Sequence, residues 1–175
     1  MKFTKTPIKD AYIVNLETIE DDRGFFARLF CQKEFKEKKL NNNFVQINDS
    51  FTKKKGTIRG MHYQKKPKQE VKIVRCISGK IFDVIIDLRK TSQTYLNWYG
   101  LELSSQNKKM LYVPNGCAHG FLTLSNNCEV FYLVSQEYSP KHEMGLRFDD
   151  PKINIKWPLK ILYGSDKDMN WEKYK

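Results

Sequence analysis

The sequence predicts an all-β fold, a sandwich or a barrel, with a short helix near each end. Short runs of apolar and β-branched residues, such as 71–77 and 80–88, are typical of strands. Close turns such as Ser78-Gly79 separate these runs and favour hairpins over helical crossovers. No internal repeat, long linker or low-complexity block divides the chain, so we expect one domain over residues 1–175.

The first part of the chain alternates expected strands with turns and one helix. The helix is expected at residues 32–40, a surface segment rich in Lys and Glu with few apolar members. Asp21-Asp22-Arg23-Gly24 has the composition of a turn. Strands are expected at 11–14, 25–30 and 44–48, and alternation in the last of these puts Gln46 and Asn48 on one face.

From residue 70 onwards the pattern is almost wholly β. Ser165 is a suitable cap for a short helix within residues 165–171. The expected strands are 71–77, 80–88, 95–103, 109–113, 120–124 and 129–135.

The remaining strand, residues 56–64, brings together two side chains of functional interest. Strict alternation would send Arg59 and His62 to opposite faces of the sheet. Gly60 lies between them and permits a bulge that re-aims a side chain. With such a bulge, an anion-binding arginine and a histidine able to act as a base line one cavity. The alternative is a buried, hydrogen-bonded histidine beside a surface arginine.

The composition is that of an ordinary globular protein. Of the 175 residues, 40% are hydrophobic and 29% are charged. No apolar run approaches the length of a membrane span, and the basic start lacks the apolar core of a signal peptide. We therefore expect a cytoplasmic protein. The cysteines show no metal or disulfide spacing and are expected to be reduced: Cys31, Cys76, Cys117 and Cys128.

The net charge of +11 raises the possibility of nucleic-acid binding. However, the lysines are scattered along the chain, and the densest run, Lys53-Lys54-Lys55, lies just before Gly56 and resembles a solvated turn. A basic surface equally suits a small anionic substrate such as a sugar nucleotide. We therefore expect neither a nucleic-acid partner nor a membrane partner.

The segment Pro114 to Phe121 contains a P-x-G-x-x-H turn leading into a strand, which resembles the second half of the cupin jelly-roll signature. Metal-binding cupins supply H-x-H and a glutamate in the first half, whereas here only His62 stands at that place. His62 and His119 without a carboxylate at ligand spacing do not make a metal site. His142 lies in a loop after Pro140. We therefore expect a jelly roll without a metal or another cofactor.

Further strings of the chain resemble, in order and spacing, the RmlC family, the dTDP-4-dehydrorhamnose 3,5-epimerases. Together they cover the chain from about Thr6 to about Asp168, and several such strings are far more specific than any single motif. They are Asp22-Arg23-Gly24-Phe25-Phe26, Phe44-Val45-Gln46, Arg59 to Gln64, Lys72 to Cys76, Pro114 to Phe121, Tyr138-Ser139-Pro140 and Asp149-Asp150-Pro151 through Trp157-Pro158.

The resemblance implies an epimerase that works by enolisation next to a 4-keto group. Such a reaction needs a base, an acid on the opposite face and a group that stabilises the enolate. By resemblance His62 is the base, Asp150 the carboxylate that orients it, Tyr132 the acid and Lys72 the lysine near the keto oxygen. The residues alone also permit purely structural roles. Asp150 could form a turn before Pro151, Tyr132 could belong to the core, and Lys72 could be a solvated strand residue.

The resemblance also implies a set of substrate-binding residues. Arg59 and Arg23 match arginines that grip the diphosphate, a task that suits guanidinium groups. Tyr138 matches the aromatic residue stacked on the base, and the other matches to substrate-contacting positions are Phe26, Gln46, Asn48 and His119. The family pairs into a homodimer that shares an N-terminal strand, so Arg23 and Phe26 are expected to serve the partner's site.

At Arg28 the chain departs from the best-known members, which carry a glutamate near the thymine. A carboxylate accepts a hydrogen bond from thymine N3, whereas arginine offers only donors. The change leaves open a cytidine- or other nucleotide-linked substrate. The alternative is that Arg28 points to solvent or pairs with a nearby acid.

Rival functions remain at this point. One is a non-catalytic cupin that binds a sugar, and the combination of His62, Asp150, Tyr132 and Lys72 weighs against it. Another is a metal-dependent cupin oxygenase or isomerase, which the missing H-x-H disfavours. A 3,4-ketoisomerase is a nearer rival. The expected function is inversion of C3, C5 or both in a nucleotide-linked 4-keto-6-deoxysugar, for deoxysugar and polysaccharide biosynthesis.

Overall fold

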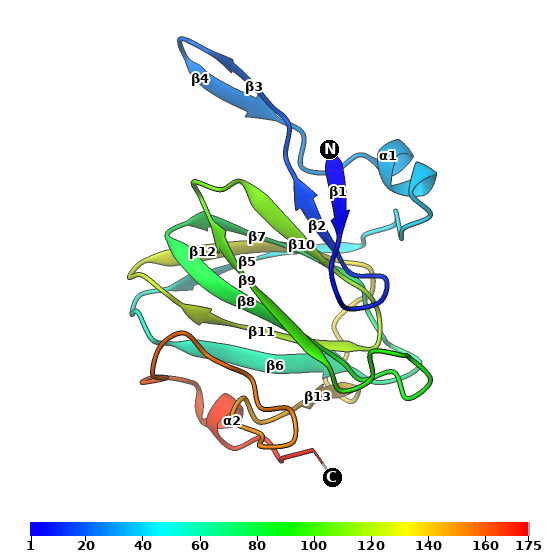
Figure 1. The fold of residues 1–175 in the computed structure, drawn as a ribbon, viewed down its shortest axis with the longest axis vertical. Helices are drawn as coiled ribbons and strands as arrows, with labels where there is room; N and C mark the ends of the chain where they lie inside the picture. Colours follow the sequence, from blue (N-terminus) through cyan, green and yellow to red (C-terminus); the bar gives the residue numbers. More distant parts are fainter. Residues whose placement is uncertain (175) are drawn as a thin grey trace.

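Two antiparallel β-sheets packed face to face make up the body of the protein (Figure 1). The computed structural model describes residues 1–174, and the sheets in this part of the chain confirm the expected all-β sandwich. Both helices are short: α1 (Gln32–Glu37) and α2 (Asp166–Met169) lie close to the expected ranges.

The larger sheet has six strands in the order β1-β2-β10-β7-β12-β5. Its strands are β1 (Lys2–Lys5), β2 (Tyr12–Asn15), β10 (Lys109–Val113), β7 (Lys72–Ser78), β12 (Cys128–Val134) and β5 (Gln46–Thr52). The smaller sheet has five strands in the order β13-β6-β11-β8-β9. Its strands are β13 (Glu143–Gly145), β6 (Ile58–Gln64), β11 (Cys117–Thr123), β8 (Lys80–Asp87) and β9 (Trp98–Ser104).

Apolar side chains fill most of the space between the sheets, and polar side chains line the rest. Because side chains alternate along a strand, every second residue of each inner strand points inward. The apolar inward set packs into one cluster that includes Val74, Cys76, Ile81, Ile85 and Val130. Further along the same strands the inward positions are polar, and these residues form the cleft described below.

β6 contains the bulge that the sequence suggested at Gly60. Ile58 and Met61 both belong to clusters on the outer side of the smaller sheet, although strict alternation would separate them. The register between β6 and β11 shifts at this point. Gly60 has φ +121°, and a Cβ there would lie 2.6 Å from Cα of Gly120, so the close approach requires glycine. As a result Arg59 and His62 both face the interior.

Each sheet has a partial cover on its outer face. Phe35 of α1 is fully buried against the larger sheet, where it packs with Ile73 and Tyr112. The C-terminal segment covers the smaller sheet through apolar residues that include Ile153 and Ile155. Ser165 caps α2 as expected, since its Oγ accepts a hydrogen bond from the backbone N–H of Asp168 at 3.1 Å.

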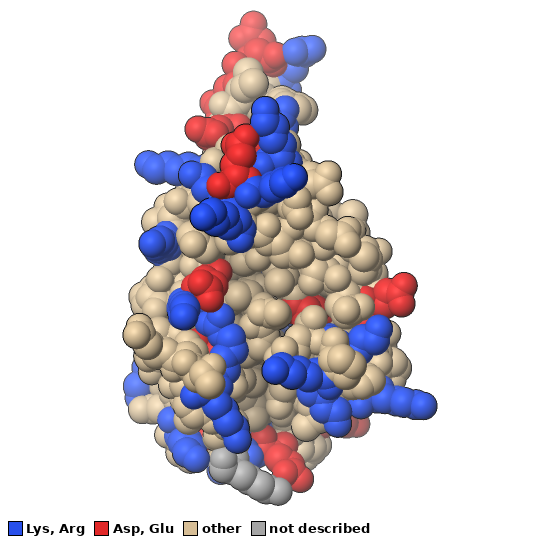
Figure 2. Space-filling view, turned by 90° about the vertical axis from the view of Figure 1, so that its right-hand side faces the viewer, with Lys and Arg blue, Asp and Glu red and all other residues tan. Residues whose placement is uncertain are grey.

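A two-stranded hairpin, β3 (Thr18–Asp21) and β4 (Gly24–Ala27), projects from the body (Figure 1). Figure 2 shows it as a narrow extension above the rounded body, with acidic and basic side chains on its surface. The expected strand at 25–30 is therefore too long, because the chain leaves the hairpin after Ala27 and Phe30 packs against Phe35. The short strands β1, β3 and β13 were not predicted.

Neither helix in residues 1–174 has the length or the apolar composition that a membrane crossing needs.

Candidate active site

The polar part of the interior opens as a cleft between the two sheets. It consists of a cavity of about 310 Å³ and a smaller one of about 170 Å³, which share His62, Lys72 and Tyr132 as lining residues. Most of the predicted site residues line this cleft: Gln46, Asn48, Arg59, His62, Lys72, His119, Tyr132 and Tyr138. Their roles in catalysis and binding remain predictions.

His62 has a carboxylate partner from the C-terminal helix. Its Nε2 lies 2.5 Å from Oδ1 of Asp168, and the side chain of Asp168 is only 6% exposed. The imidazole itself is 33% exposed. Nδ1 has no protein partner among the described residues, so this nitrogen is free to take a proton from a molecule in the cleft.

Asp168 is ionised at neutral pH despite its burial. Burial alone would raise the pKa of this carboxyl, but the hydrogen bond and charge of His62 and the bond from Ser165 lower it. The net result is an Asp168 pKa below its ordinary value. A fixed negative charge at Nε2 orients the imidazole and stabilises its protonated form.

The prediction that Asp150 orients His62 is wrong. Asp150 is 2% exposed and accepts hydrogen bonds from the backbone N–H groups of Lys152, at 2.8 Å, and Tyr174. These bonds make Asp150 the centre of a turn before and after Pro151 and tie the end of the chain to it. The turn-forming alternative considered for this residue is the one observed.

Only a weak local sign marks Asp168 in the sequence. It stands three residues after Ser165, where an acidic side chain is usually part of a helix cap. Its carboxylate instead points into the body and meets a residue 106 positions earlier in the chain. Only the docking of α2 against β6 brings the two together, and no local pattern predicts that contact.

Tyr132 approaches the cleft from the sheet opposite His62. It lies on β12 of the larger sheet, whereas His62 lies on β6 of the smaller one. Burial raises the pKa of Tyr132, the nearby Glu70 raises it further, and Arg59 opposes the shift. The phenol is therefore protonated at neutral pH and able to donate.

Lys72 is a cleft residue and not a solvated strand lysine. Its side chain is 11% exposed, and Nζ forms an ion pair of 3.0 Å with Oε1 of Glu70. The pair leaves an ammonium group with further donors beside Tyr132 in the lining of the cleft.

The other end of the cleft carries a second cation. Arg59 donates from Nε to Oγ1 of Thr52 at 2.8 Å and from Nη2 to the backbone oxygen of Phe51 at 3.1 Å. These bonds fix the guanidinium at an exposed position. An arginine held in this way can bind a phosphate group.

An aromatic residue stands at the entrance of the larger cavity. Tyr138 is 56% exposed and donates its hydroxyl to Oε2 of Glu143 at 2.6 Å, and Lys167 binds the same oxygen at 2.5 Å. Gln46 and Asn48 lie beside it and are joined by a hydrogen bond of 2.8 Å. The exposed ring offers a stacking surface for a planar group, with amide groups nearby.

His119 is paired with a carboxylate that the sequence did not single out. Its Nε2 lies 2.7 Å from Oδ1 of Asp83, and the two side chains are 10% and 0% exposed. His119 and His62 are opposite each other in the register of β11 and β6. The cleft therefore contains two His–Asp pairs side by side.

The hairpin residues lie outside this cleft. Arg23 is 90% exposed and pairs with Asp21 at 2.6 Å, and Phe26 is 65% exposed. Arg28 forms an ion pair with Glu34 at 3.1 Å and is 59% exposed. This pairing matches the alternative considered for Arg28. Within one chain, none of these side chains reaches the cleft.

No group of three or more His, Cys, Asp and Glu side chains within residues 1–174 is arranged to hold a metal ion. Freedom from metal stays a prediction.

The chain is similar in sequence to proteins of known name. Residues 5–175 match the family described as dTDP-4-dehydrorhamnose 3,5-epimerase. A protein of that name from Methanothermobacter thermautotrophicus is 43% identical over 174 residues, which cover 98% of this chain and 93% of the relative.

Solved structures are similar over the same extent. A dTDP-4-dehydrorhamnose 3,5-epimerase from Bacillus anthracis, with TDP and PPi bound, has a TM-score of 0.96 and 39% identity over 99% of each chain. An epimerase from Legionella pneumophila in complex with dTDP-4-keto-L-rhamnose has a TM-score of 0.93 and 34% identity, covering 98% of this chain and 92% of that one.

Proposed function

Because the chain belongs to the dTDP-4-dehydrorhamnose 3,5-epimerase family, it is an isomerase, and we propose that it converts dTDP-4-dehydro-6-deoxyglucose to dTDP-4-dehydrorhamnose. The observation that carries the proposal is the position of His62 and Tyr132 on opposite walls of one cleft. The two side chains come from facing sheets, and inversion at carbon needs proton removal on one face and delivery on the other.

His62 is the base in this mechanism. The protons at C3 and C5 of the sugar are acidic because the electron pair left behind is delocalised into the C4 carbonyl. Nδ1 of His62 takes the proton, and Asp168 stabilises the imidazolium that forms through its bond to Nε2. The C–H bond breaks, and the sugar becomes an enolate.

Tyr132 completes the inversion. Its hydroxyl gives a proton to the carbon from the opposite face and becomes a phenolate, while the enolate returns to a ketone. Before the next event the imidazolium loses its proton and the phenolate regains one by exchange with water. His62 is one-third exposed, which suits this exchange.

The charge on the enolate oxygen needs a stabilising donor. Lys72 lines the cleft beside both His62 and Tyr132, and its ammonium group is largely shielded from bulk water. A donor that already points at the developing charge lowers the barrier without reorganisation.

The nucleotide is held by the outer part of the cleft. The fixed guanidinium of Arg59 suits the diphosphate, and the exposed ring of Tyr138 suits stacking on the base. Gln46 and Asn48, which line the same cavity as Tyr138, supply further polar contacts.

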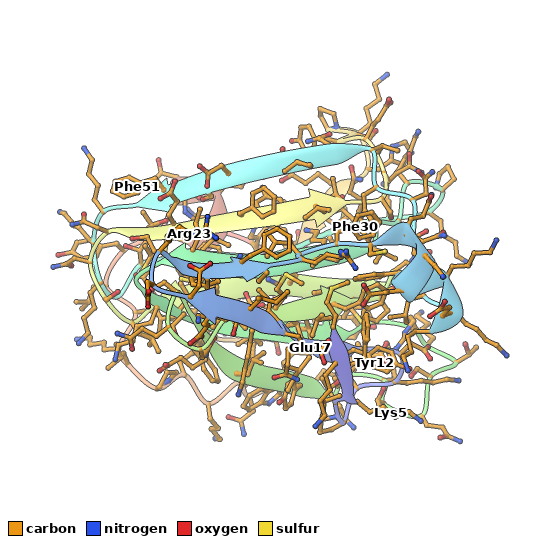
Figure 3. All side chains as sticks on the ribbon, turned by 90° about the horizontal axis from the view of Figure 1, so that it is seen from above. Lys5, Tyr12, Glu17, Arg23, Phe30 and Phe51 are labelled. Carbon is orange, nitrogen blue, oxygen red and sulfur yellow. The ribbon has the colours of Figure 1, made fainter. Side chains whose placement is uncertain are left out.

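The working unit is a homodimer that shares the hairpin. The outer face of the larger sheet exposes Ile47 at 60% and Phe51 at 50%, and the hairpin exposes Ile19 at 71%, Phe25 at 50% and Phe26 at 65%. Figure 3 looks down on this face, with Arg23 on the hairpin and Phe51 on the edge strand β5. Exposed apolar surfaces of this kind are typical of protein interfaces. In the dimer Arg23 and Phe26 complete the partner's site.

Sugar analysis of the product tests the function. After incubation with dTDP-4-dehydro-6-deoxyglucose and borohydride reduction, we expect 6-deoxy sugars of the L-manno and L-talo configurations. Recovery of the D-gluco and D-galacto products alone, at the level of a sample without protein, would contradict the proposal. Products inverted at C3 alone would limit the activity to one centre.

A further inference from the structure

Asp83 is a buried charge that the mechanism above does not use. It lies on β8 among inward-facing residues, between Ile81 and Ile85, and is 0% exposed. Oδ1 meets Nε2 of His119 at 2.7 Å, whereas Oδ2 has no hydrogen-bond partner among residues 1–174. A carboxyl group is buried in proteins only where a cation compensates its charge or where it takes up a proton and becomes neutral.

His119 is the basic side chain in contact with Asp83. The cations that line the same cavity are engaged elsewhere: Lys72 pairs with Glu70, and Arg59 is bound to Thr52 and Phe51 at the exposed end. The remaining ionisable groups on the cavity wall are His62, Tyr132 and Asp168. His62 is already paired with Asp168, so a neutral His119 would leave Asp83 uncompensated.

A net-neutral pair fixes the proton on the other ring nitrogen. If Asp83 is ionised, His119 is an imidazolium with protons on both nitrogens. If the shared proton sits on Asp83 instead, the imidazole accepts at Nε2 and carries its own proton on Nδ1. Nδ1 is therefore a donor in both arrangements. It has no protein partner and is not enclosed, and His119 lines the cavity.

We propose that Asp83 is a positioning residue that keeps a proton on Nδ1 of His119, so that His119 donates a hydrogen bond to the substrate oxygen that becomes negative on enolisation. The inference rests on the proposed function. It also separates the two His–Asp pairs by role. The imidazole of His62, which is 33% exposed, exchanges protons with carbon and water. The imidazole of His119, which is 10% exposed, keeps its proton.

Nitrogen NMR of the resting enzyme tests the proton directly, without substrate. The chain has three histidines, and His119→Gln identifies the signals of His119. At pH 7 we expect a protonated Nδ1 in the parent and a loss of that state in Asp83→Ala, which offers Nε2 neither a charge nor a hydrogen bond. A bare Nδ1 in the parent would overturn the proposal even if the variants fail to fold.

A double-mutant cycle tests the consequence for catalysis. Asp83→Ala is expected to lower kcat by about 10²–10³-fold with little change in KM, the usual cost of losing one donor to an oxyanion. In a His119→Gln background the same substitution should cost little more, because both act through one nitrogen. Equal losses in the two backgrounds would show that Asp83 has only a structural role.

Asp87→Ala is the matched control. Asp87 is also a fully buried β8 carboxylate, but its partners are Arg89, Ser92 and Thr94, away from the cleft. This variant should lose stability while its Nδ1 signal and kcat remain close to the parent. A parent enzyme that fails to convert the sugar would refute the proposed function, whereas an active parent with an unchanged Asp83→Ala rate would refute only this inference.

Discussion

Between the two sheets, facing strands and neighbouring side chains hold the residues of the proposed chemistry in place. The β3–β4 hairpin, in contrast, carries its predicted binding residues into solvent. His62 is fixed by Asp168 and His119 by Asp83, and both carboxylates are almost fully buried. Arg23, in contrast, pairs only with Asp21 on its own hairpin. Both His–Asp pairs of the interior form within one chain, whereas in the proposed dimer the hairpin acts on the site of the second chain.

This difference predicts two kinds of variant. Substitutions in the interior should lower kcat and leave the dimer intact, because they remove groups that act on the reacting carbons. Substitutions in the hairpin should weaken assembly or substrate binding and leave the groups of the interior in place.

The largest effect is expected for Tyr132→Phe. The variant keeps the ring and its packing but lacks the proton for the second face, so inversion should slow by about 10²–10⁴-fold. His62 can still form the enolate, so exchange of the sugar's proton with solvent should be less impaired than inversion. Measuring both rates on one sample separates the two steps. A normal yield of epimer at a normal rate would make Tyr132 a core residue only.

The next effect concerns the hairpin and is tested by mixing. Arg23→Ala should lose about 10–100-fold in kcat/KM, as expected when one charged contact to a phosphate is removed. When Arg23→Ala and His62→Ala are unfolded and refolded together, some dimers contain one chain of each variant. Such a mixed dimer has one complete site, with Arg23 from the hairpin of the His62→Ala chain and His62 from the body of the Arg23→Ala chain. About a quarter of the parent's activity should return in an equal mixture of a symmetric dimer.

Two results would contradict the proposal that the hairpin of one chain serves the site of the other. One is a mixture with no more activity than its components, and the other is a parent protein that scatters light as a monomer of 20.7 kDa at micromolar concentration. The control is a mixture of two variants of the same cleft residue, His62→Ala and His62→Asn, which should remain inactive.

Asp168→Asn should produce a smaller, pH-dependent loss of stability. The folded state lowers the pKa of Asp168, so its ionised form stabilises the fold above the unfolded value of about 3.9 and this contribution disappears as pH falls through the folded pKa. We expect a deficit of about 1–3 kcal/mol in the free energy of unfolding at pH 7, which shrinks at pH 3. Denaturant unfolding at both values measures it. A deficit that is the same at both would mean that packing, not charge, is lost.

The smallest effect is expected for Arg28. Its exposed ion pair with Glu34 is worth about 0–1 kcal/mol, so Arg28→Gln should barely change stability, and Arg28→Glu slightly more because it places two acids together. Titrating dTDP, CDP, UDP and GDP into the parent and both variants tests base selection. We expect dTDP to bind tightest to all three. A preference of the parent for CDP that Arg28→Glu reverses would show that Arg28 reads the base.

Much of the fold was predictable because strands leave a local pattern. Alternation and turn residues located most strands to within a few residues, and Gly60 correctly indicated the bulge that brings Arg59 and His62 to one face. The short strands β1 and β3 were missed because four residues with exposed polar positions carry little pattern.

The site was predictable where one strand or one matching string carries it. His62, Tyr132 and Lys72 were located in this way, but their carboxylate partners were not. Asp168 reaches His62 from a helix 106 positions later, and Asp83 is a single acid in an otherwise apolar strand. Such contacts follow from the packing of distant elements, which is why Asp150 was mistaken for Asp168.

The central claim is that His62 enolises a 4-keto sugar, and deuterium incorporation in heavy water tests it most directly. With dTDP-4-dehydro-6-deoxyglucose, the parent should place deuterium at C3 and C5 at the rate of turnover, and His62→Ala should slow this by about 10²–10⁴-fold. Lys54→Ala, at a residue that does not line the cleft, is the control and should exchange like the parent. Exchange in His62→Ala at the parent's rate, or turnover in the parent without any deuterium at either carbon, would contradict the account.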